Sequence, residues 1–277
     1  MINKIRNSSR LRLLIRNIAN SVYITQDVLI LLFLHTKSFF NNIQFKDTEF
    51  KIVTASDTSH FQSAKQLISS IHKYNKNAKI VFYDLGLQKI EIAELLELDI
   101  IYKKFDFDAY PNFFKLTEPD AGAYAWKPHI IFNEMNNFSG NLIWMDAGNV
   151  IIKPIYKLLF LLTNIGFYSP LSNGYVRQWT HQSTLNSMNV EKFIYRKRML
   201  NAAIIGINTE NKKYKNFITN WKNLAIQKNL ILPEGAGKSN HRWDQSLLTV
   251  SYYKEIGKII FLRTHKYFGI LTHQDVD

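Results

Sequence analysis

The sequence predicts an α/β protein in which a mixed, mainly parallel β-sheet is flanked by helices. From residue 50 onwards, short apolar runs alternate with longer segments of helical periodicity, which is the pattern of strands joined by crossover helices. The chain has 277 residues, of which 46% are hydrophobic and 14% aromatic, so it can bury one large core. We therefore expect one α/β domain over residues 46–277 and a separate segment over residues 1–45.

The first part of this domain contains three predicted strands and two helices. Residues 50–54 form an apolar run that predicts the first strand, and the apolar side chains from 64 to 71 then recur at intervals typical of one helix face. Residues 79–83 predict the second strand. A glycine turn separates it from a helical segment at 90–98, and residues 99–105 predict the third strand.

A long irregular segment and a buried strand follow. Residues 106–123 contain two prolines and a glycine and predict a loop of the kind that often carries function. Pro128 suits the first turn of a helix, which we expect to continue over residues 130–136. Residues 141–145 predict a buried strand that delivers Asp146 at its carboxyl end. Four further elements are expected: strands at 165–169 and 202–207, and helices at 214–228 and 244–254.

The first 45 residues differ from the rest of the chain. A run of seven residues, 28–34, is too short for a membrane-spanning helix, which needs roughly 20 apolar residues. A secretory signal is disfavoured because no small-residue cleavage site follows this run. We expect a basic helical appendage that either packs on the domain or rests as an amphipathic segment on an anionic membrane. Five basic residues precede the run: Lys4, Arg6, Arg10, Arg12 and Arg16.

The formal net charge of +13 favours anionic partners, among them a nucleotide diphosphate, an acidic glycan, an anionic membrane and nucleic acid. Basic residues are concentrated at the amino end and no recognised nucleic-acid motif is present, so we expect no nucleic-acid partner. Cysteine is absent, which excludes disulfides and thiolate chemistry and suits a cytoplasmic protein. Peripheral attachment to the membrane through the basic segment is a further expectation.

Asp146 is the carboxylate that the sequence places most clearly. It follows the apolar run 142–145, and the small residues Ala147 and Gly148 after it let a ligand approach the backbone. Hard divalent cations take oxygen ligands, and Mg²⁺ often uses one or two carboxylates together with substrate phosphates. Asp146 is therefore a candidate ligand, with a carboxylate that only caps a turn as the alternative. Since ligands of open α/β sheets bind beyond the carboxyl ends of strands, Asp146 and residues 54–57 should share one crevice.

The order of these motifs resembles that of GT-A-type nucleotide-sugar glycosyltransferases, especially glycogenin-like and related bacterial families. The resemblance rests on the strand and helix order, on Tyr-Ala-Trp-Lys-Pro at 124–128 and on Leu-Ile-Trp-Met-Asp-Ala-Gly at 142–148, and it covers residues 50–277. It implies a GT-A, Rossmann-like fold. It also implies sugar transfer from a nucleoside-diphosphate donor, expected to be a UDP-sugar, to a hydroxyl of a glycan or lipid-linked acceptor in surface polysaccharide or glycolipid synthesis.

The resemblance implies a donor and metal site. In the family an Asp-x-Asp motif holds Mn²⁺ or Mg²⁺ and the donor diphosphate; Asp146 matches its first aspartate, whereas Gly148 stands in place of the second. A histidine near the end of many such enzymes also binds the metal, and His265 or His273 matches it. The expected donor-binding residues are Thr54, Ala55, Ser56, Asp57, Trp126, Lys127, Asp146, Ala147 and Gly148.

Three residues are expected on the catalytic and acceptor side. Asn201 begins a strand-like segment that resembles the one carrying sugar contacts in the family, and Asp244 opens a helix in an Asp-Gln pair. His181 lies in a loop after the predicted strand 165–169. Asn201 could hydrogen-bond a sugar hydroxyl. Asp244 and His181 also have structural interpretations, since a helix N-terminus favours a carboxylate such as Asp244 and the segment around His181 could serve packing.

Two other functions compete with glycosyl transfer. The segment 235–239, Gly-Ala-Gly-Lys-Ser, is similar to part of a phosphate-binding loop, but Leu232 stands where such a loop needs glycine and no suitable strand precedes it. A basic binding protein for membranes or nucleic acid is supported by net charge alone. A catalytically inactive GT-A-like protein is a third possibility, because the second aspartate is missing.

Overall fold

The computed structural model describes residues 49–257 and 265–277. The predicted appendage at 1–45 lies outside the described residues, so its structure and its role stay predictions. No helix in the described ranges is long and apolar enough to cross a membrane.

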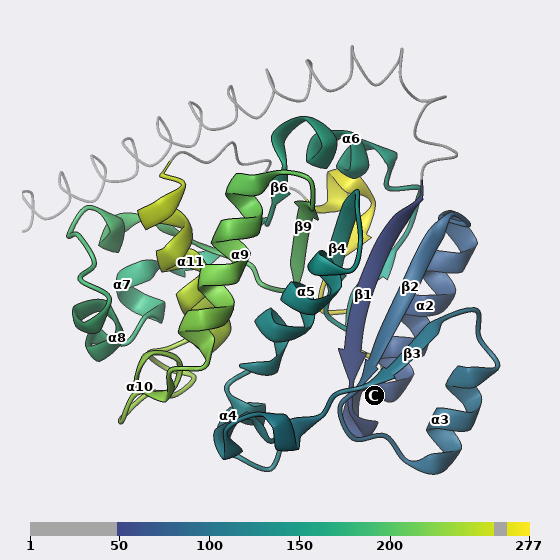
Figure 1. The fold of residues 1–277 in the computed structure, drawn as a ribbon, viewed down its shortest axis with the longest axis horizontal. Coiled ribbons are helices and arrows are strands. Elements are labelled where there is room, and N and C mark those ends of the chain that lie inside the picture. Colours follow the sequence, from purple (N-terminus) through teal and green to yellow (C-terminus); the bar gives the residue numbers. More distant parts are fainter. Residues whose placement is uncertain (1–48, 258–264) are drawn as a thin grey trace, which may run out of the picture.

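The fold is built around a six-stranded sheet with the order β3-β2-β1-β4-β9-β6 (Figure 1). The strands β1 to β4 are parallel neighbours, whereas β9 runs antiparallel to both β4 and β6. The sheet is therefore mixed and mainly parallel, which confirms the predicted fold class. Its strands are β1 (Phe50–Ser56), β2 (Ala78–Asp84), β3 (Ile101–Lys104), β4 (Asn141–Met145), β6 (Phe167–Tyr168) and β9 (Ile204–Asn208).

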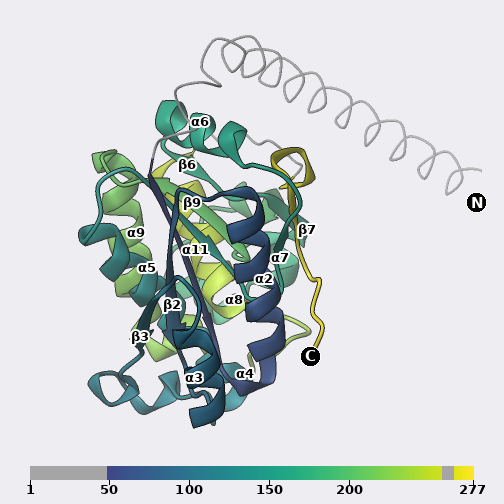
Figure 2. The same ribbon diagram turned by 90° about the vertical axis from the view of Figure 1, so that its right-hand side faces the viewer.

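Helices cover both faces of this sheet, and the alternation of side chains along each strand explains why (Figure 2). In β4, Leu142 and Trp144 belong to one hydrophobic core, while Ile143 and Met145 belong to the other. A strand buried on both faces reads as a continuous apolar run, as residues 142–145 of β4 do.

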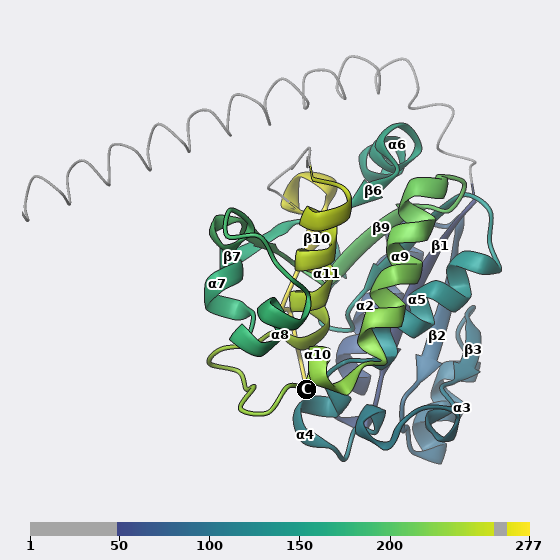
Figure 3. The same cartoon turned by 60° about the vertical axis from the view of Figure 1, so that its left-hand side comes forward.

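Two sets of helices form the outer layers. On one face, α2 (Phe61–Tyr74), α3 (Lys89–Leu96) and α6 (Tyr156–Ile165) contribute to the core that contains Ile143. On the other face, α5 (Trp126–Asn136), α9 (Lys212–Ala225) and α11 (Trp243–Glu255) pack on the core that contains Trp144 (Figure 3).

Shorter elements complete the described ranges. Two antiparallel pairs lie apart from the main sheet: β7 (Leu171–Tyr175) with β8 (Arg198–Leu200), and β5 (Val150–Ile151) with β10 (Ile270–Leu271). Short helical turns connect the larger elements: α4 (Pro119–Gly122), α7 (Val176–Trp179), α8 (Gln182–Ser187) and α10 (Lys228–Ile231).

Several predicted boundaries need correction. The predicted strand at 165–169 shrinks to the two residues of β6, because Ile165 is the last residue of α6 and Gly166 ends that helix with a φ of +95°. The predicted helix at 214–228 is two helices, since α9 ends at Ala225 and Lys228 begins α10. The apolar helix α6 and the β7–β8 pair were not predicted.

Candidate functional site

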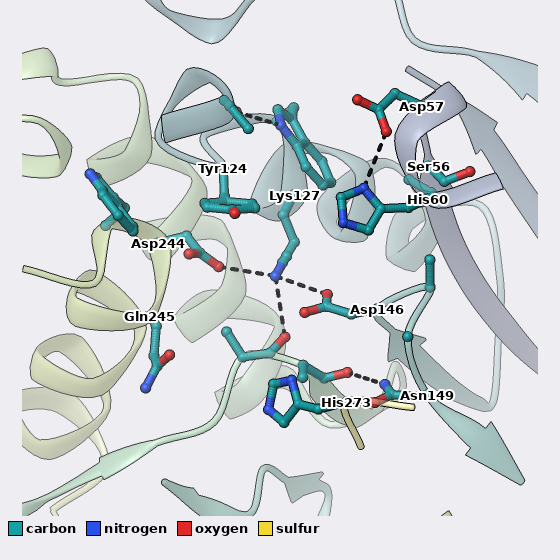
Figure 4. Close-up of a pocket in the computed structure, with 18 of the residues that line it drawn as sticks. Ser56, Asp57, His60, Tyr124, Lys127, Asp146, Asn149, Asp244, Gln245 and His273 are labelled. Atoms are coloured by element: carbon teal, nitrogen blue, oxygen red, sulfur yellow. Dashed lines mark hydrogen bonds and ion pairs between the residues drawn. The ribbon is translucent and has the colours of Figure 1, made fainter. Parts of the chain in front are cut away.

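A cavity of about 380 Å³ opens at the carboxyl ends of β1 and β4 (Figure 4). This is the edge of the sheet where the sequence places a ligand, and the turn after β1 and the turn after β4 meet there as expected. Eleven of the predicted site residues line the cavity: Ala55, Ser56, Asp57, Trp126, Lys127, Asp146, Ala147, Gly148, Asn201, Asp244 and His273.

Three predicted site residues lie outside the lining. Thr54 is fully buried within β1, one residue short of the opening. His181 instead precedes α8, where its Nδ1 accepts a hydrogen bond from the backbone N–H of Ser183 at 3.3 Å. His265 lies in a 3₁₀ turn at 265–268, and its Nε2 is 3.4 Å from Oγ1 of Thr272.

Lys127 forms the centre of the site. It lies in the first turn of α5 and its side chain is buried, yet its Nζ reaches Oδ1 of Asp146 at 2.9 Å and Oδ2 of Asp244 at 3.4 Å (Figure 4). The aromatic faces of Tyr124 and Trp144 lie 5.5 Å and 5.6 Å from the same nitrogen. Burial lowers the pKa of Lys127, but the two carboxylates outweigh burial and raise this pKa above its ordinary value. Lys127 is therefore a permanent buried cation.

Asp244 is the buried partner in this cluster. It lies at the start of α11 and is 4% exposed. Burial raises its pKa to about 6; Lys127 opposes this rise and Asp146 adds to it. The contact between Asp244 and Lys127 is an ion pair without hydrogen-bond geometry, because Oδ2 of Asp244 has no hydrogen-bond partner within the described residues. A carboxyl group whose pKa lies close to neutral pH can hold or release a proton at physiological pH.

Asp146 is held on one side and open on the other. Its Oδ1 accepts hydrogen bonds from Nε1 of Trp144 at 2.7 Å and from Lys127. The backbone N–H of Asp146 donates to the carbonyl of Ala203 at 3.0 Å, which ties the turn after β4 to the start of β9. Its side chain is 39% exposed, so the second carboxylate oxygen faces the cavity.

Asn201 has a structural contact as well as a place in the lining. Its Oδ1 accepts a hydrogen bond from the backbone N–H of Ala203 at 2.8 Å, which shapes the turn before β9. In the same turn, the side-chain amide of Asn149 donates to the carbonyl of Ala203 at 2.7 Å. The side-chain nitrogen of Asn201 makes no such hydrogen bond to a described residue, so it is the group that could donate to a ligand.

One part of the cavity wall has an unusual backbone. The five residues 120–124 all have φ between +52° and +65°, a left-handed turn that costs L-residues roughly 1–2 kcal/mol each. The indole of Trp126 donates to the carbonyl of Ala121 at 3.1 Å and stabilises this turn. The turn places Ala121 and Tyr124 in the lining of the cavity. Trp243 also has a positive φ, +41°, and its buried Nε1 has no hydrogen-bond partner within the described residues.

Sequence reasoning missed several lining residues. Gln245 faces the cavity from α11 (Figure 4), and only its adjacency to Asp244 marked it in the sequence. Arg242 lines the same side and stacks on Trp179, with 4.1 Å between its guanidinium carbon and the ring centroid. Asp275 reaches the cavity from the last described segment, and nothing in its sequence context marked it.

The charge of the lining differs in sign from that of the whole chain. Four carboxylates line the cavity, on Asp57, Asp146, Asp244 and Asp275, against two cations, Lys127 and Arg242. With its histidines neutral the lining therefore carries a formal charge of −2, although the chain carries +13. A ligand that is itself an anion needs additional positive charge to bind there.

The residues present fit a divalent cation only in part. No set of three or more histidine, cysteine, aspartate or glutamate side chains in the described ranges converges closely enough to hold a metal ion alone. The open oxygen of Asp146 and the anionic lining are nevertheless the environment that Mg²⁺ or Mn²⁺ uses when substrate phosphates and water complete its shell. The donor set therefore fits an ion that binds together with an anionic ligand.

The segment 235–239 does not have the structure of a phosphate-binding loop. The helix α10 precedes it rather than a strand, and α11 begins only at Trp243. The side chain of Asn240 closes this loop by donating to the carbonyl of Gly235 at 3.0 Å and accepting from the N–H of Gly237 at 2.9 Å. The phosphate-loop hypothesis lacks its strand and is rejected.

Comparisons with known proteins give a fold and little else. A family model described as a protein of unknown function, DUF1647, matches residues 22–132, which end before Asp146. No curated protein matches the sequence. A solved structure of WbbM, described as a bifunctional glycosyltransferase, matches with 17% identity over 76% of this chain and 38% of that chain, at a TM-score of 0.50.

Other solved structures match at lower TM-scores. The glycosyltransferase GlyE from Streptococcus pneumoniae is 13% identical over 75% of this chain and 44% of its own, at 0.43. Mouse xyloside xylosyltransferase 1 is 10% identical over 76% of this chain and 83% of its own, at 0.48. This chain thus spans less than half the length of the WbbM and GlyE chains. From its sheet topology and its likeness to WbbM, the chain has the GT-A glycosyltransferase fold.

Proposed function

We propose that this chain is a glycosyltransferase that moves a sugar from a nucleoside-diphosphate donor to an acceptor hydroxyl. One observation supports the proposal above all: the ammonium group of Lys127 joins the carboxylates of Asp146 and Asp244 inside a cavity at the carboxyl edge of a GT-A sheet. These three residues come from α5, the turn after β4 and α11, which are distant in sequence.

The donor would lie along the edge formed by β1 and β4. Ala55, Ser56 and Asp57 line the cavity beside the end of β1, where a base and ribose would bind. The diphosphate would lie near Asp146, next to the first turn of α5, where the helix dipole favours an anion. The buried charge of Lys127 favours the additional negative charge that develops on a departing diphosphate.

A divalent cation bound at Asp146 would supply charge neutralisation of the diphosphate leaving group. Such an ion would also offset the negative charge of the lining, because an anionic cavity would otherwise repel an anionic donor. We expect Mn²⁺ or Mg²⁺, with Asp146 as its ligand on the turn after β4. His273 lines the same cavity, whereas His265 does not.

The acceptor side would be formed by α11 and the turn before β9. Asp244 and Gln245 face the cavity from the first turn of α11, and Asn201 faces it from the opposite wall. The carboxylate of Asp244, ionised above its raised pKa of about 6, would stabilise positive charge on the sugar ring or accept a proton from an acceptor hydroxyl. His181, which lies outside the lining, would act only if the loop that carries it moved.

The donor and the acceptor are a further part of the proposal. We expect a UDP-sugar as donor and a glycan or lipid-linked acceptor, in surface polysaccharide or glycolipid synthesis. A cytoplasmic location, with the basic segment 1–45 at an anionic membrane, is the corresponding expectation. The competing function is a GT-A-like protein without activity, or a basic membrane-binding protein.

A thermal-shift screen tests the proposal. Purified protein is heated with a panel of nucleotide sugars, with and without Mn²⁺ or Mg²⁺, because a bound donor raises the melting temperature by mass action. We expect one nucleotide family to stabilise the wild type and not Asp146→Ala. Asp99→Ala, at an exposed position outside the cavity, serves as the control and should respond like the wild type. A folded protein that responds to no donor would contradict glycosyl transfer and favour the inactive or membrane-binding function.

A further inference from the structure

A carboxylate from the far end of the chain occupies the space beside Gly148. A Cβ atom built on Gly148 would lie 2.2 Å from Oδ1 of Asp275 and 2.8 Å from its Cγ. Real Cβ atoms essentially never approach other atoms so closely, so any side chain at position 148 would displace Asp275. Glycine at this position therefore permits the contact, and the carboxylate of Asp275 lies where a side chain at position 148 would begin.

The segment that carries Asp275 is held on both sides. Before it, the backbone N–H of Gln274 donates to the carbonyl of Gly148 at 2.7 Å, and Nε2 of Gln66 donates to the carbonyl of Gln274 at 3.0 Å. After it, the backbone N–H of Val276 donates to Oγ of Ser63 at 3.0 Å. The last described residues run beside α2 in this way (Figure 2).

Asp277 adds the strongest of these anchors. Its Oδ1 accepts hydrogen bonds from the backbone N–H groups of Gln62 at 2.9 Å and Ser63 at 3.2 Å, so it caps the amino end of α2. Its Oδ2 accepts from the hydroxyl of Ser63. A carboxylate at a helix N-terminus is favoured by the free N–H groups and by the helix dipole. Asp275 is therefore positioned by contacts on either side of it rather than by its own side chain.

The carboxylate of Asp275 has no hydrogen-bond or ion-pair partner within the described residues. It lines the same cavity as Asp146, where the formal charge of the lining is −2. Three buried polar atoms of that lining also lack hydrogen-bond partners within the described ranges: Nε1 of Trp243, Oγ of Ser56 and Oδ2 of Asp244. Buried groups without partners indicate a missing ligand. Asp275 itself is exposed, and the excess of carboxylates over cations in the lining indicates that this ligand includes a cation.

We propose that Asp275 supplies the second carboxylate of a divalent-cation site, together with Asp146. The carboxylate of Asp275 occupies the space that a side chain at position 148 would fill. The ion would be Mn²⁺ or Mg²⁺, and because the described ranges contain no third side-chain ligand converging with these two, oxygens of a bound diphosphate and water would complete its shell. The presence of a diphosphate in the site rests on the proposed function. The choice of Asp275 as the ligand rests on its contact with Gly148.

Direct measurement of Mn²⁺ binding tests this assignment. Free Mn²⁺ is titrated by its electron paramagnetic resonance signal against the wild-type chain and Asp275→Asn, in the presence and absence of UDP or GDP. We expect Asp275→Asn to weaken Mn²⁺ binding by about tenfold or more, as losses of groups around a metal typically do. Far-UV circular dichroism and the melting temperature establish that each variant is folded.

Asp57→Asn, measured in the absence of nucleotide because Asp57 lies where the base and ribose would bind, is the matched control: it removes one carboxylate from the same cavity at a position away from Gly148. Its effect on Mn²⁺ affinity should stay within about threefold, since exposed charges that do not touch the ion are largely screened by salt. If Asp57→Asn weakened binding as much as Asp275→Asn, the effect would be that of net charge and the assignment would be wrong.

A swap of positions gives the sharpest result. Gly148→Asp alone should displace the segment around Asp275, because the new Cβ would overlap its carboxylate. The double variant Gly148→Asp with Asp275→Gly returns the carboxylate to the turn after β4 and makes room for it. We expect the double variant to bind Mn²⁺ within about tenfold of the wild type, and more tightly than Asp275→Asn.

The outcomes separate this inference from the proposed function. Equal Mn²⁺ affinity in the wild type and Asp275→Asn, or a wild type that binds no Mn²⁺, overturns the assignment of Asp275. If the nucleotide still binds while Mn²⁺ affinity is equal in the wild type and Asp275→Asn, the assignment of Asp275 is wrong but glycosyl transfer is left intact. Mn²⁺ binding that depends on Asp275, in a protein that binds no nucleotide diphosphate, supports the cation site and contradicts the proposed donor.

Discussion

The ammonium nitrogen of Lys127 lies 2.9 Å from Oδ1 of Asp146, and this ion pair joins the first turn of α5 to the end of β4. The same nitrogen lies 3.4 Å from Asp244, so one buried cation holds two carboxylates from opposite sides of the cavity. A buried ion pair has this effect only while it is complete, because removal of one partner leaves an uncompensated charge. The stability of the fold and the chemistry of the site therefore depend on the same three side chains.

Lys127→Met should lower the free energy of unfolding by about 3 kcal/mol, because the buried carboxylate of Asp244 would lose its only nearby cation among the described residues. Urea denaturation at pH 7.5 measures this loss. Lys213→Met, at an exposed position on α9, should change the free energy by no more than about 0.5 kcal/mol. Wild-type stability in Lys127→Met would contradict the buried ion pairs of Lys127 with Asp146 and Asp244.

Asp244 should make stability fall as pH rises. Its pKa is about 6 in the folded chain against an ordinary 3.8, so between these values the folded state binds the proton more tightly than the unfolded state. The free energy of unfolding therefore decreases from pH 3.8 to pH 6 through this group, and this contribution stays constant above pH 6. The difference between the wild type and Asp244→Asn, measured by urea denaturation at several pH values, should decrease over that interval. A difference that is flat with pH would contradict the raised pKa.

His241 should have the opposite effect. It is buried, accepts a hydrogen bond at Nδ1 from the N–H of His181 at 3.0 Å, and its Nε2 lies 3.0 Å from the carbonyl of Ile231. Burial lowers its pKa from 6.5 to about 4, so the unfolded state binds the proton more tightly between these values.

The stability that neutral His241 contributes is therefore fully present above pH 6.5 and is lost as pH falls toward 4. In His241→Gln, the free energy of unfolding should fall less steeply over this interval than in the wild type. His129 has a similarly lowered pKa, about 4, so part of the slope should persist in the variant. An unchanged slope in His241→Gln would show that this imidazole titrates alike in both states.

Glu134 should be important for stability and not for the site. Its buried carboxylate accepts hydrogen bonds from Lys51 at 2.8 Å, Lys103 at 2.5 Å and the hydroxyl of Tyr83 at 2.8 Å. Glu134→Gln leaves the buried Lys51 without its partner and should lower the free energy of unfolding by about 3 kcal/mol.

An exposed pair provides the control for this prediction. Glu94→Gln breaks the ion pair between Glu94 and Lys65, whose side chains are 43% and 35% exposed, and should change stability by less than about 1 kcal/mol. Both variants should keep the wild-type response to donors in the thermal-shift screen, because neither glutamate lines the cavity. Equal losses of stability would show that burial does not distinguish the two carboxylates.

Gln245 should be important for transfer and not for stability. Its side chain faces the cavity and makes no hydrogen bond to another described residue. Gln245→Ala should keep the melting temperature and reduce turnover by about 10²-fold, as loss of one positioned polar group in an active site commonly does. Release of the nucleoside diphosphate, measured with the donor found in the screen, gives the turnover. Wild-type turnover in the variant would remove Gln245 from the proposed mechanism.

The local sequence pattern was enough to predict most strands of the sheet. The strand β4 was predicted at 141–145 and lies there, because a strand buried on both faces needs an unbroken apolar run. The helix α5 begins at Trp126, earlier than predicted, since Pro128 occupies its third position rather than its first. The apolar run Leu158–Leu162 could form a strand or a helix by pattern alone, and packing against both β6 and β9 decides for α6.

Local sequence was enough to identify the charged residues at the end of β4 and at the starts of α5 and α11. Asp146 after β4, Lys127 before a proline and Asp244 before a glutamine were identified from their neighbours, because strand ends, helix starts and small-residue turns depend on residues nearby in the chain. The positions of Lys127 between the carboxylates of Asp146 and Asp244, and of Asp275 against Gly148, became visible only in the folded chain. Contacts between residues far apart in sequence depend on how whole helices pack on the sheet, and no local pattern encodes that packing.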